Sequence, residues 1–367
     1  MPGMEVYAEI LLAIDTSPTW HSLSLYPHVT EITWLAVLPM LALFLVPQLL
    51  HREQLSFLVY VLIGVAIFQA VLGLIQYGDG TQSLFRFGME GHNHSAIGTY
   101  PNRNHLAGYL EMLLPIMIAI SLARFTKSET NSRFSLRKKL AGWGRVRHQK
   151  TIFLGLAIVL VVLGLIFTRS RTGIALTMIG IFLCAILYSR LFNKNFTHKS
   201  IFVLVVAVLV IAAEAGLTPI LNRFTLQDPL ADSRWTIYSD TLQGIQTFFP
   251  FGSGPGTFSY VFPRFQSPEL SKYINYAHND YLELLFEGGI FAGLLIVFGI
   301  VLFCMRWLRV LALRAPTEFN FIQIGSGIAI ILMLLHSFLD FNLHIPANAI
   351  VFSFLCGIFF KKNTYKK

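Results

Sequence analysis

Residues 55–76 read LSFLVYVLIGVAIFQAVLGLIQ, an apolar run without a charged side chain. A helix needs about 20 mostly apolar residues to cross the hydrocarbon core of a bilayer, so this run predicts a membrane-spanning helix. Comparable runs occupy roughly residues 32–50, 105–124, 151–168, 173–191, 200–217, 289–310, 321–340 and 346–360. The last run is short, and we expect it to be tilted or partly interfacial. The sequence therefore predicts an all-α polytopic membrane protein with about nine transmembrane helices.

The composition supports the same fold class. Of 367 residues, 54% are hydrophobic and only 13% are charged, whereas a soluble domain carries about 25% charged residues. The three cysteines, Cys184, Cys304 and Cys356, lie inside apolar runs without a metal-binding spacing, so we interpret them as small buried hydrophobic residues. The net charge of +9 comes from basic loops between apolar runs. We therefore interpret it as a topology signal and expect no nucleic-acid partner.

The loops between the runs alternate in charge. The segment from Arg124 to Lys150 holds nine Lys or Arg residues against one Glu, and the C-terminal tail is also basic. Residues 218–288 hold four basic and seven acidic residues, and residues 1–31 hold four acidic residues and no Lys or Arg. Because cytoplasmic loops are enriched in Lys and Arg, we expect the basic loops and the C-terminus to be cytoplasmic and the other loops to face outward.

This topology predicts five parts of the chain. They are an outer N-terminal segment at 1–31, helices one to six at 32–217, a large, partly helical outer loop at 218–288, helices seven to nine at 289–360, and a basic cytoplasmic tail at 361–367. The second part includes an outer loop at 77–104 and a basic cytoplasmic loop at 125–150. An odd number of spans with a cytoplasmic C-terminus places the N-terminus outside, although residues 1–31 lack a cleavable signal pattern. We therefore expect either that upstream spans are missing or that the start codon is misplaced.

Some polar groups in the outer loops have an ordinary structural interpretation. The run from Gly252 to Gly256 follows no predicted strand and lies among Pro and Phe residues, which favours a tight turn over a phosphate-binding loop. His92 and His94 lack a matching carboxylate or thiol cluster, so we expect no metal site. Arg169 and Arg171 fit interfacial anchors, whose side chains extend from the membrane into water. Positive charge is disfavoured at the outer end of a helix, however, which favours a specific role. The two interpretations are equally open.

Other polar residues favour a functional interpretation. His278 occurs where the large loop meets a helix, grouped with Asn279, Asp280 and Glu283. Three ionisable residues lie within or at the ends of apolar runs, where such side chains usually face a cavity or a partner: Glu111, His336 and Asp340. For Glu111, a functional role and a structural pairing with another helix are equally open. The aromatic residues of the large loop suit sugar stacking and a place at the membrane interface equally well.

Six motifs follow one another along the chain. They read GTYPNRNHLAGY at 98–109, TRSRTG at 168–173, SRW at 233–235, PFGSGPGTF at 250–258, AHNDYLELLFEG at 277–288 and HSFLDFNLHIP at 336–346. In this order and topological placement they resemble the O-antigen ligase and polymerase superfamily of bacterial inner-membrane proteins, over roughly residues 30–360.

The resemblance implies a multi-spanning glycosyltransferase with a large periplasmic loop. Characterised members transfer a glycan from undecaprenyl diphosphate to a hydroxyl acceptor, which is a lipid A core sugar, another glycan chain or a protein side chain. They are inverting and metal-independent, so the resemblance implies no cofactor. Donor and acceptor would meet at the membrane, among its lipids, on the periplasmic face. A ligase in lipopolysaccharide or exopolysaccharide biosynthesis and a polymerase of the same superfamily are both compatible with these motifs.

The resemblance also assigns roles to residues. Members require periplasmic arginines and a loop histidine, which match Arg171, Arg234 and His278. Guanidinium groups stabilise a departing diphosphate without a metal, and a neutral histidine accepts the proton of an attacking hydroxyl. The matched motifs complete the expected substrate-binding set with Arg103, Asn104, Arg169, Asn279, Asp280 and Glu287. Of these, we expect Asp280 or Glu287 to orient the histidine.

Two other classes of function are open. A transporter, such as the bicarbonate-like carriers described in the superfamily, would carry paired ionisable groups or broken helices near the bilayer midplane. The chain has no internal repeat and few mid-span polar residues, namely Gln69, Glu111 and Glu214, which weighs against transport. A structural subunit of an export machine would not need the arginine and histidine set. Family members commonly have more spans, so we expect a chain without its upstream helices to be partly or wholly inactive.

Overall fold

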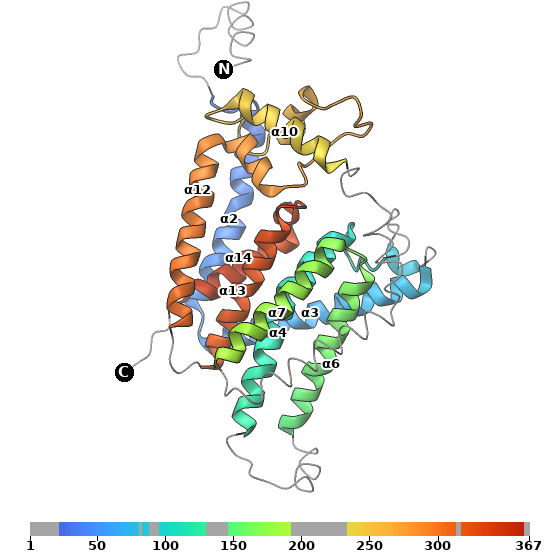
Figure 1. Cartoon of the computed structure of the whole chain (residues 1–367), viewed down its shortest axis with the longest axis vertical. Helices are drawn as coiled ribbons and strands as arrows, with labels where there is room; N and C mark the ends of the chain where they lie inside the picture. The colour runs from blue at the N-terminus through green and yellow to red at the C-terminus, as the bar shows by residue number, and fades with distance from the viewer. Residues whose placement is uncertain are drawn as a thin grey trace, which may run out of the picture. The chain divides into compact units, whose positions relative to one another are not determined.

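The structure, a computed structural model, describes residues 22–80, 83–87, 95–129, 146–191, 233–312 and 317–362 (Figure 1). Every regular element within these residues is a helix. In chain order they are α2 (Pro27–Leu49), α3 (Arg52–Asp79), η2 (Leu84–Arg86), α4 (Arg103–Glu129), α6 (Val146–Phe167), α7 (Arg171–Leu191), α10 (Arg234–Phe248), α11 (Phe258–Val261), η4 (Phe262–Arg264), α12 (Asp280–Leu311), α13 (Glu318–His336), η5 (Asn342–His344) and α14 (Pro346–Phe360). The predicted all-α class is confirmed.

Six of the described helices are long and apolar enough to cross a membrane: α2, α3, α4 over Arg103–Arg124, α7 over Arg171–Tyr188, α12 and α13. Two shorter apolar helices, Ile152–Phe167 within α6 and α14 itself, fall on the runs predicted at 151–168 and 346–360. The run predicted at 200–217 lies outside the described residues. The chain is a multi-pass helical membrane protein, and the sidedness of its loops stays a prediction.

The surface of α12 is apolar where a soluble protein would be polar. Leu294, Leu295 and Phe298 expose 61%, 68% and 60% of their surface. A large contiguous apolar face is unusual on a soluble monomer and marks a surface that meets lipid or another protein. Together with the length of the helix, this exposure fits a face that meets acyl chains.

The chain divides into two compact units. To the extent that the structure describes them, the first takes in residues 1–41, 228–305 and 337–344, and the second takes in residues 42–227, 306–336 and 345–367.

In the second unit, α4 and α13 pack against each other and both contact α7 and α14, while α3 packs against α4 and α6 (Figure 1). Gly325 on α13 permits this packing, because a Cβ there would lie 3.0 Å from the Cα of Ile116 and from the carbonyl oxygen of Pro115 on α4. Small residues let membrane helices approach closely and gain van der Waals contact. The backbones of α4 and α13 therefore meet at Gly325.

The first unit has its own hydrophobic core, made by the large loop and the start of α12. Its buried members are Ile237, Phe248, Phe258, Val261, Phe262, Ala277 and Phe286. Phe248 and Phe258 pack edge to face against Phe286, with ring centroids 5.6 Å and 5.1 Å away. Such aromatic pairs each stabilise a core by about 0.5–1.5 kcal/mol beyond their burial. The described part of the large loop is therefore packed around this aromatic centre.

Helix α12 begins earlier than the apolar run predicts and bends where that run begins. The sequence places the start of the span at residue 289, whereas α12 begins at Asp280 and is kinked at Gly289, with φ +53° and ψ −136°. This left-handed φ favours glycine. The Gly-rich turn, residues 250–257, replaces helical hydrogen bonds at the bend, since Ser253 N–H donates to the carbonyl of Phe286 at 3.0 Å and Ile290 N–H donates to the carbonyl of Pro250 at 2.9 Å.

Helix α13 ends four residues before the predicted end of its apolar run. The run extends to residue 340, but the helix stops at His336. Residues 337–344, here called the return segment, instead bind the start of α12, where Asp280 N–H donates to the carbonyl of Ser337 at 2.8 Å. Hydropathy alone does not show this exit, because Phe338, Leu339 and Phe341 are as apolar as the residues of the helix. The exit places Asp340 in the first unit.

Candidate active site

His278 and Asp340 form the centre of the polar site in the first unit. His278 directly precedes the N-cap of α12 and has a φ of +52°, which is uncommon for a residue other than glycine. Its Nδ1 lies 3.4 Å from Oδ1 of Asp340. The side chain of Asp340 is 1% exposed, while that of His278 is 29% exposed. A buried carboxylate therefore faces an imidazole that solvent can reach.

Helix α10 brings Arg234 and Tyr238 to the same place. Nη2 of Arg234 lies 3.7 Å from Oδ2 of Asp340, and its Nη1 donates to the carbonyl of Leu339 at 2.6 Å. One turn later, the Tyr238 hydroxyl donates to the carbonyl of His278 at 2.8 Å. Two of the three predicted catalytic residues, His278 and Arg234, thus meet on the carboxylate of Asp340.

Asp280 pairs with His344 of the return segment. Oδ1 of Asp280 lies 2.8 Å from Nδ1 of His344, and Oε1 of Glu283 lies 3.2 Å from Nε2 of the same ring. Burial lowers the pKa of His344, but Glu283, Asp280 and Glu287 raise it to about 9. Asp280, one of the two residues predicted to orient His278, therefore contacts another histidine, and it is Asp340 that contacts His278.

Glu287 binds the Gly-rich turn. Its Oε2 accepts the N–H of Gly256 at 2.8 Å and its Oε1 accepts the N–H of Phe258 at 2.9 Å. The glycines at 252, 254 and 256 all have a positive φ, as expected for a tight turn. Because Glu287 is also buried, its described contacts hold the turn against α12.

Asn279 is the N-cap of α12. Its Oδ1 accepts the N–H groups of Tyr281 and Leu282 at 3.0 Å and 3.1 Å. An asparagine at this position satisfies backbone donors that the first turn of a helix leaves unpaired. Its described contacts are therefore structural, like those of Glu287.

The remaining predicted residues lie in the second unit. Arg103 and Arg171 are the first residues of α4 and α7. Asn104 donates its N–H to Oδ1 of Asn102 at 2.9 Å. Arg169 has a φ of +55° and lies over the ring of Tyr77, with its Cζ 5.4 Å from the ring centroid. The predicted set of Arg171, Arg234 and His278 is therefore divided between the two units.

The second unit also contains a buried ionisable pair. Oε1 of Glu111 on α4 lies 2.8 Å from Nδ1 of His336 on α13, and both side chains are fully buried. Of the two roles open for Glu111, the structure provides a pairing with another helix. Among the described residues, no group of three or more His, Cys, Asp or Glu residues has the arrangement of a metal site, and His92 and His94 lie outside these residues.

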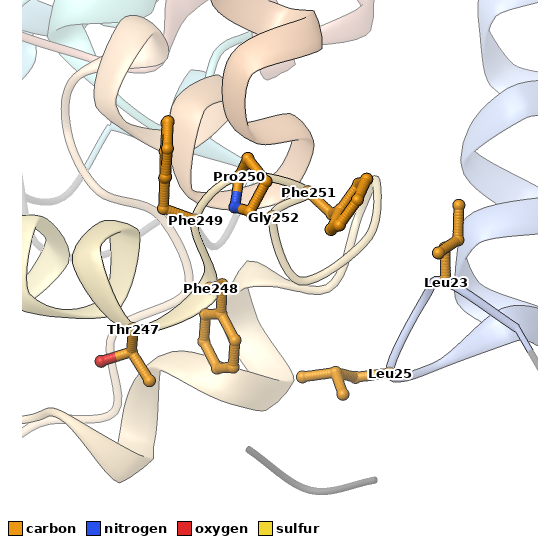
Figure 2. Close-up of a pocket in the computed structure, with 8 residues that line it drawn as sticks. All are labelled: Leu23, Leu25, Thr247, Phe248, Phe249, Pro250, Phe251 and Gly252. Atoms are coloured by element: carbon orange, nitrogen blue, oxygen red, sulfur yellow. The ribbon is translucent and has the colours of Figure 1, made fainter. Parts of the chain in front are cut away.

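The aromatic residues of the large loop divide into two sets. Among the described residues of the loop, Phe248, Phe258 and Phe262 are core residues, whereas Trp235, Phe249, Phe251, Tyr260 and Tyr273 have exposed rings. Beside the Gly-rich turn lies an open pocket of about 300 Å³, lined by residues 247–252 together with Leu23 and Leu25. Figure 2 shows the side chain of Leu25 pointing toward Phe248, and the hydroxyl of Thr247 pointing away. The exposed rings are accessible to sugar or lipid.

His344 is not among the predicted site residues, and Asp340 is predicted only as an ionisable residue at the end of an apolar run. Both belong to the motif HSFLDFNLHIP at 336–346, which places a carboxylate and an imidazole four residues apart directly after an apolar run. This pattern in the sequence indicates Asp340 and His344 as candidate site residues. Their partners, at positions 278, 280 and 283, follow only from the path of the return segment.

The helices and this charged cluster define a multi-pass membrane protein with a polar site on a helical loop. A family model described as O-antigen ligase matches residues 156–297, which include Arg171, Arg234 and His278. The match confirms the resemblance to the O-antigen ligase superfamily that the ordered motifs indicated. It supports a ligase- or polymerase-type membrane enzyme that is glycosyltransferase-like and acts on lipid-linked glycans. No curated protein matches the chain closely enough to count as a relative.

Proposed function

We propose that this chain is an inner-membrane glycosyltransferase of the O-antigen ligase type. It transfers a glycan from undecaprenyl diphosphate to a hydroxyl acceptor on the periplasmic face, without a metal. The observation that carries the proposal is the placement of His278 and Arg234 on the two oxygens of the buried Asp340. This cluster joins a general base, a cation and an orienting carboxylate, and the first two, His278 and Arg234, lie within the residues that the family model matches.

His278 acts as the base in this proposal. Asp340 accepts a hydrogen bond from Nδ1–H of His278, which leaves Nε2 as the basic nitrogen. The acceptor hydroxyl attacks the anomeric carbon of the donor sugar and loses its proton to Nε2. The bond between that carbon and the diphosphate oxygen breaks at the same time, and its electron pair leaves with the diphosphate. One displacement of this kind inverts the anomeric centre.

Arginines at helix starts stabilise the departing diphosphate. Arg103, Arg171 and Arg234 are the first residues of α4, α7 and α10, and none of these helices has an acidic residue in its first turn. A helix N-terminus attracts anions through its free N–H groups and its dipole, and a guanidinium group binds phosphate oxygens in a bidentate way. Each of these three arginines is therefore a candidate contact for a phosphate group of the donor.

The test is glycan transfer by the purified full-length chain in liposomes that contain an undecaprenyl-diphosphate-linked glycan and a hydroxyl acceptor. His278→Ala should lower the rate about 10²- to 10⁴-fold, the usual contribution of a general base. His28→Ala is the matched control, because its side chain is 85% exposed at the start of α2. Unchanged transfer by His278→Ala would overturn the proposal.

One observation favours transport as a second candidate function. The buried pair of Glu111 and His336 joins two membrane helices, and ionisable groups inside membranes often mark ion or proton pathways. Uptake of bicarbonate by proteoliposomes distinguishes the two functions. Uptake that is lost in Glu111→Gln but kept in His278→Ala would establish transport, whereas glycan transfer without uptake would establish the enzyme.

A further inference from the structure

His344 lies between two carboxylates on the first turn of α12. Its Nδ1 is 2.8 Å from Oδ1 of Asp280 and its Nε2 is 3.2 Å from Oε1 of Glu283. When both acids are ionised they only accept hydrogen bonds, and both nitrogens of a histidine donate at once only when the ring is protonated. The geometry is therefore that of an imidazolium bridging two acids.

This bridge is one of several bonds that fasten the return segment to α12. At one end of the segment, the carbonyl of Ser337 accepts the N–H of Asp280 at 2.8 Å. At the other end, Leu343 N–H donates to Oδ2 of Asp280 at 3.3 Å, next to the bridge made by His344. Asp340 lies between these two attachments. Its distance from His278, which directly precedes the N-cap of α12, therefore depends on both of them.

We propose that His344 is a positioning residue: as an imidazolium it fastens the return segment to α12 and so holds Asp340 against His278. The inference rests on the proposed role of His278 as the base. Loss of the positive charge would leave Asp280 and Glu283, which are 2% and 3% exposed, close together without a counterion. Two buried carboxylates without a cation repel each other, so the contact would open.

The surroundings of His344 require its charge. The titratable groups that face it are Asp280, Glu283 and Glu287 from α12 and Tyr276 from the preceding loop, whose ring centroid is 5.4 Å from the imidazole. Three of these four groups are acids that raise the pKa of His344 to about 9 despite its burial. The bridge is therefore intact at neutral pH and opens as the pH rises through about 9.

The experiment compares His344→Gln and His344→Lys with the wild type in the reconstituted transfer assay. Glutamine is uncharged, whereas lysine restores a cation between the two acids. We expect His344→Gln to lower kcat about 10- to 100-fold with little change in the KM for the donor, because a displaced catalytic pair is costly. His344→Lys should recover most of the rate and shift the alkaline limit of activity upward.

A second measurement does not depend on glycan transfer, so it separates failure of this inference from failure of the proposed function. Nitrogen-15 NMR of the histidines reports which ring nitrogen of His278 carries the proton in the neutral form. The Nδ1–H form should dominate in the wild type and in His344→Lys, and it should decline in both His344→Gln and Asp340→Asn. An unchanged Nδ1–H signature in His344→Gln, or a His344→Lys variant as impaired as His344→Gln, would overturn the positioning role.

Discussion

The buried carboxylate of Asp340 lies 3.4 Å from the imidazole of His278, although 62 residues separate the two along the chain. The contact exists because the chain leaves the line of α13 after His336 and returns to the start of α12. A carboxylate in this position fixes the tautomer of a histidine and stabilises its protonated form.

Asp340→Asn tests that relationship. Asparagine keeps the size of the side chain but lacks the charge that favours Nδ1–H, so we expect kcat for glycan transfer to fall at least about 10²-fold with a small change in KM. The control is Asp79→Asn, since Asp79 is exposed and the amide oxygen still accepts the hydrogen bond from Ser83. Equal activity of the two variants would contradict an orienting role for Asp340.

Glu287→Gln separates a structural role from substrate binding. The amide nitrogen of glutamine cannot accept an N–H, so either Gly256 or Phe258 loses its acceptor. A buried unsatisfied donor costs about 1–3 kcal/mol, and we expect the midpoint of thermal unfolding in detergent to fall accordingly. Transfer per folded molecule should stay near the wild-type value. A variant of wild-type stability with a raised donor KM would instead assign Glu287 to the substrate.

The pKa of His344 predicts how stability depends on pH. Burial lowers this pKa, but Glu283, Asp280 and Glu287 raise it to about 9 from the ordinary value of 6.5. The protonated ring therefore stabilises the fold, with a contribution that is complete below pH 6.5 and is lost as the pH rises through about 9. Thermal unfolding across this range should show a decline in the wild type that His344→Gln lacks. Parallel curves for the two proteins would contradict this linkage.

The sequence predicts the membrane helices well because apolarity over about 20 residues is a local property. The boundaries that it misses depend on contacts between distant segments. Helix α12 starts nine residues early because the aromatic core around Phe286 and the cap made by Asn279 stabilise its first turns. The motifs likewise indicate His278 and Arg234 as functional residues. They do not show that Asp340, rather than Asp280, contacts both, because this contact depends on the path of the return segment.

The pair of Glu111 and His336 predicts a stability effect within the second unit. His336→Leu would leave a buried carboxyl group without its partner, which typically costs about 3–5 kcal/mol. Replacing both residues with leucine removes the polar groups together and should recover much of the loss. Unfolding in detergent of His336→Leu, Glu111→Leu and the double variant measures this coupling. Additive effects of the single changes would show that the contact contributes no coupling.

Two glycines of α12 provide a matched test of the kink. At Gly289, an added Cβ would meet the carbonyl of Pro250 in a backbone conformation with φ +53°, so Gly289→Ala must open the contact between the Gly-rich turn and the helix. We expect it to destabilise the protein by more than about 1 kcal/mol, as incompatible glycine substitutions do. At Gly299, an added Cβ would meet nothing within 4 Å, and Gly299→Ala should be neutral or stabilising by about 0.5–1 kcal/mol.

Because Ser253 and Gly254 hydrogen-bond to the carbonyls of Phe286 and Glu287, Gly289→Ala should also increase protease cleavage within the turn, whereas Gly299→Ala should not. Equal stability and equal cleavage of the two variants would show that the turn does not depend on the bend at Gly289.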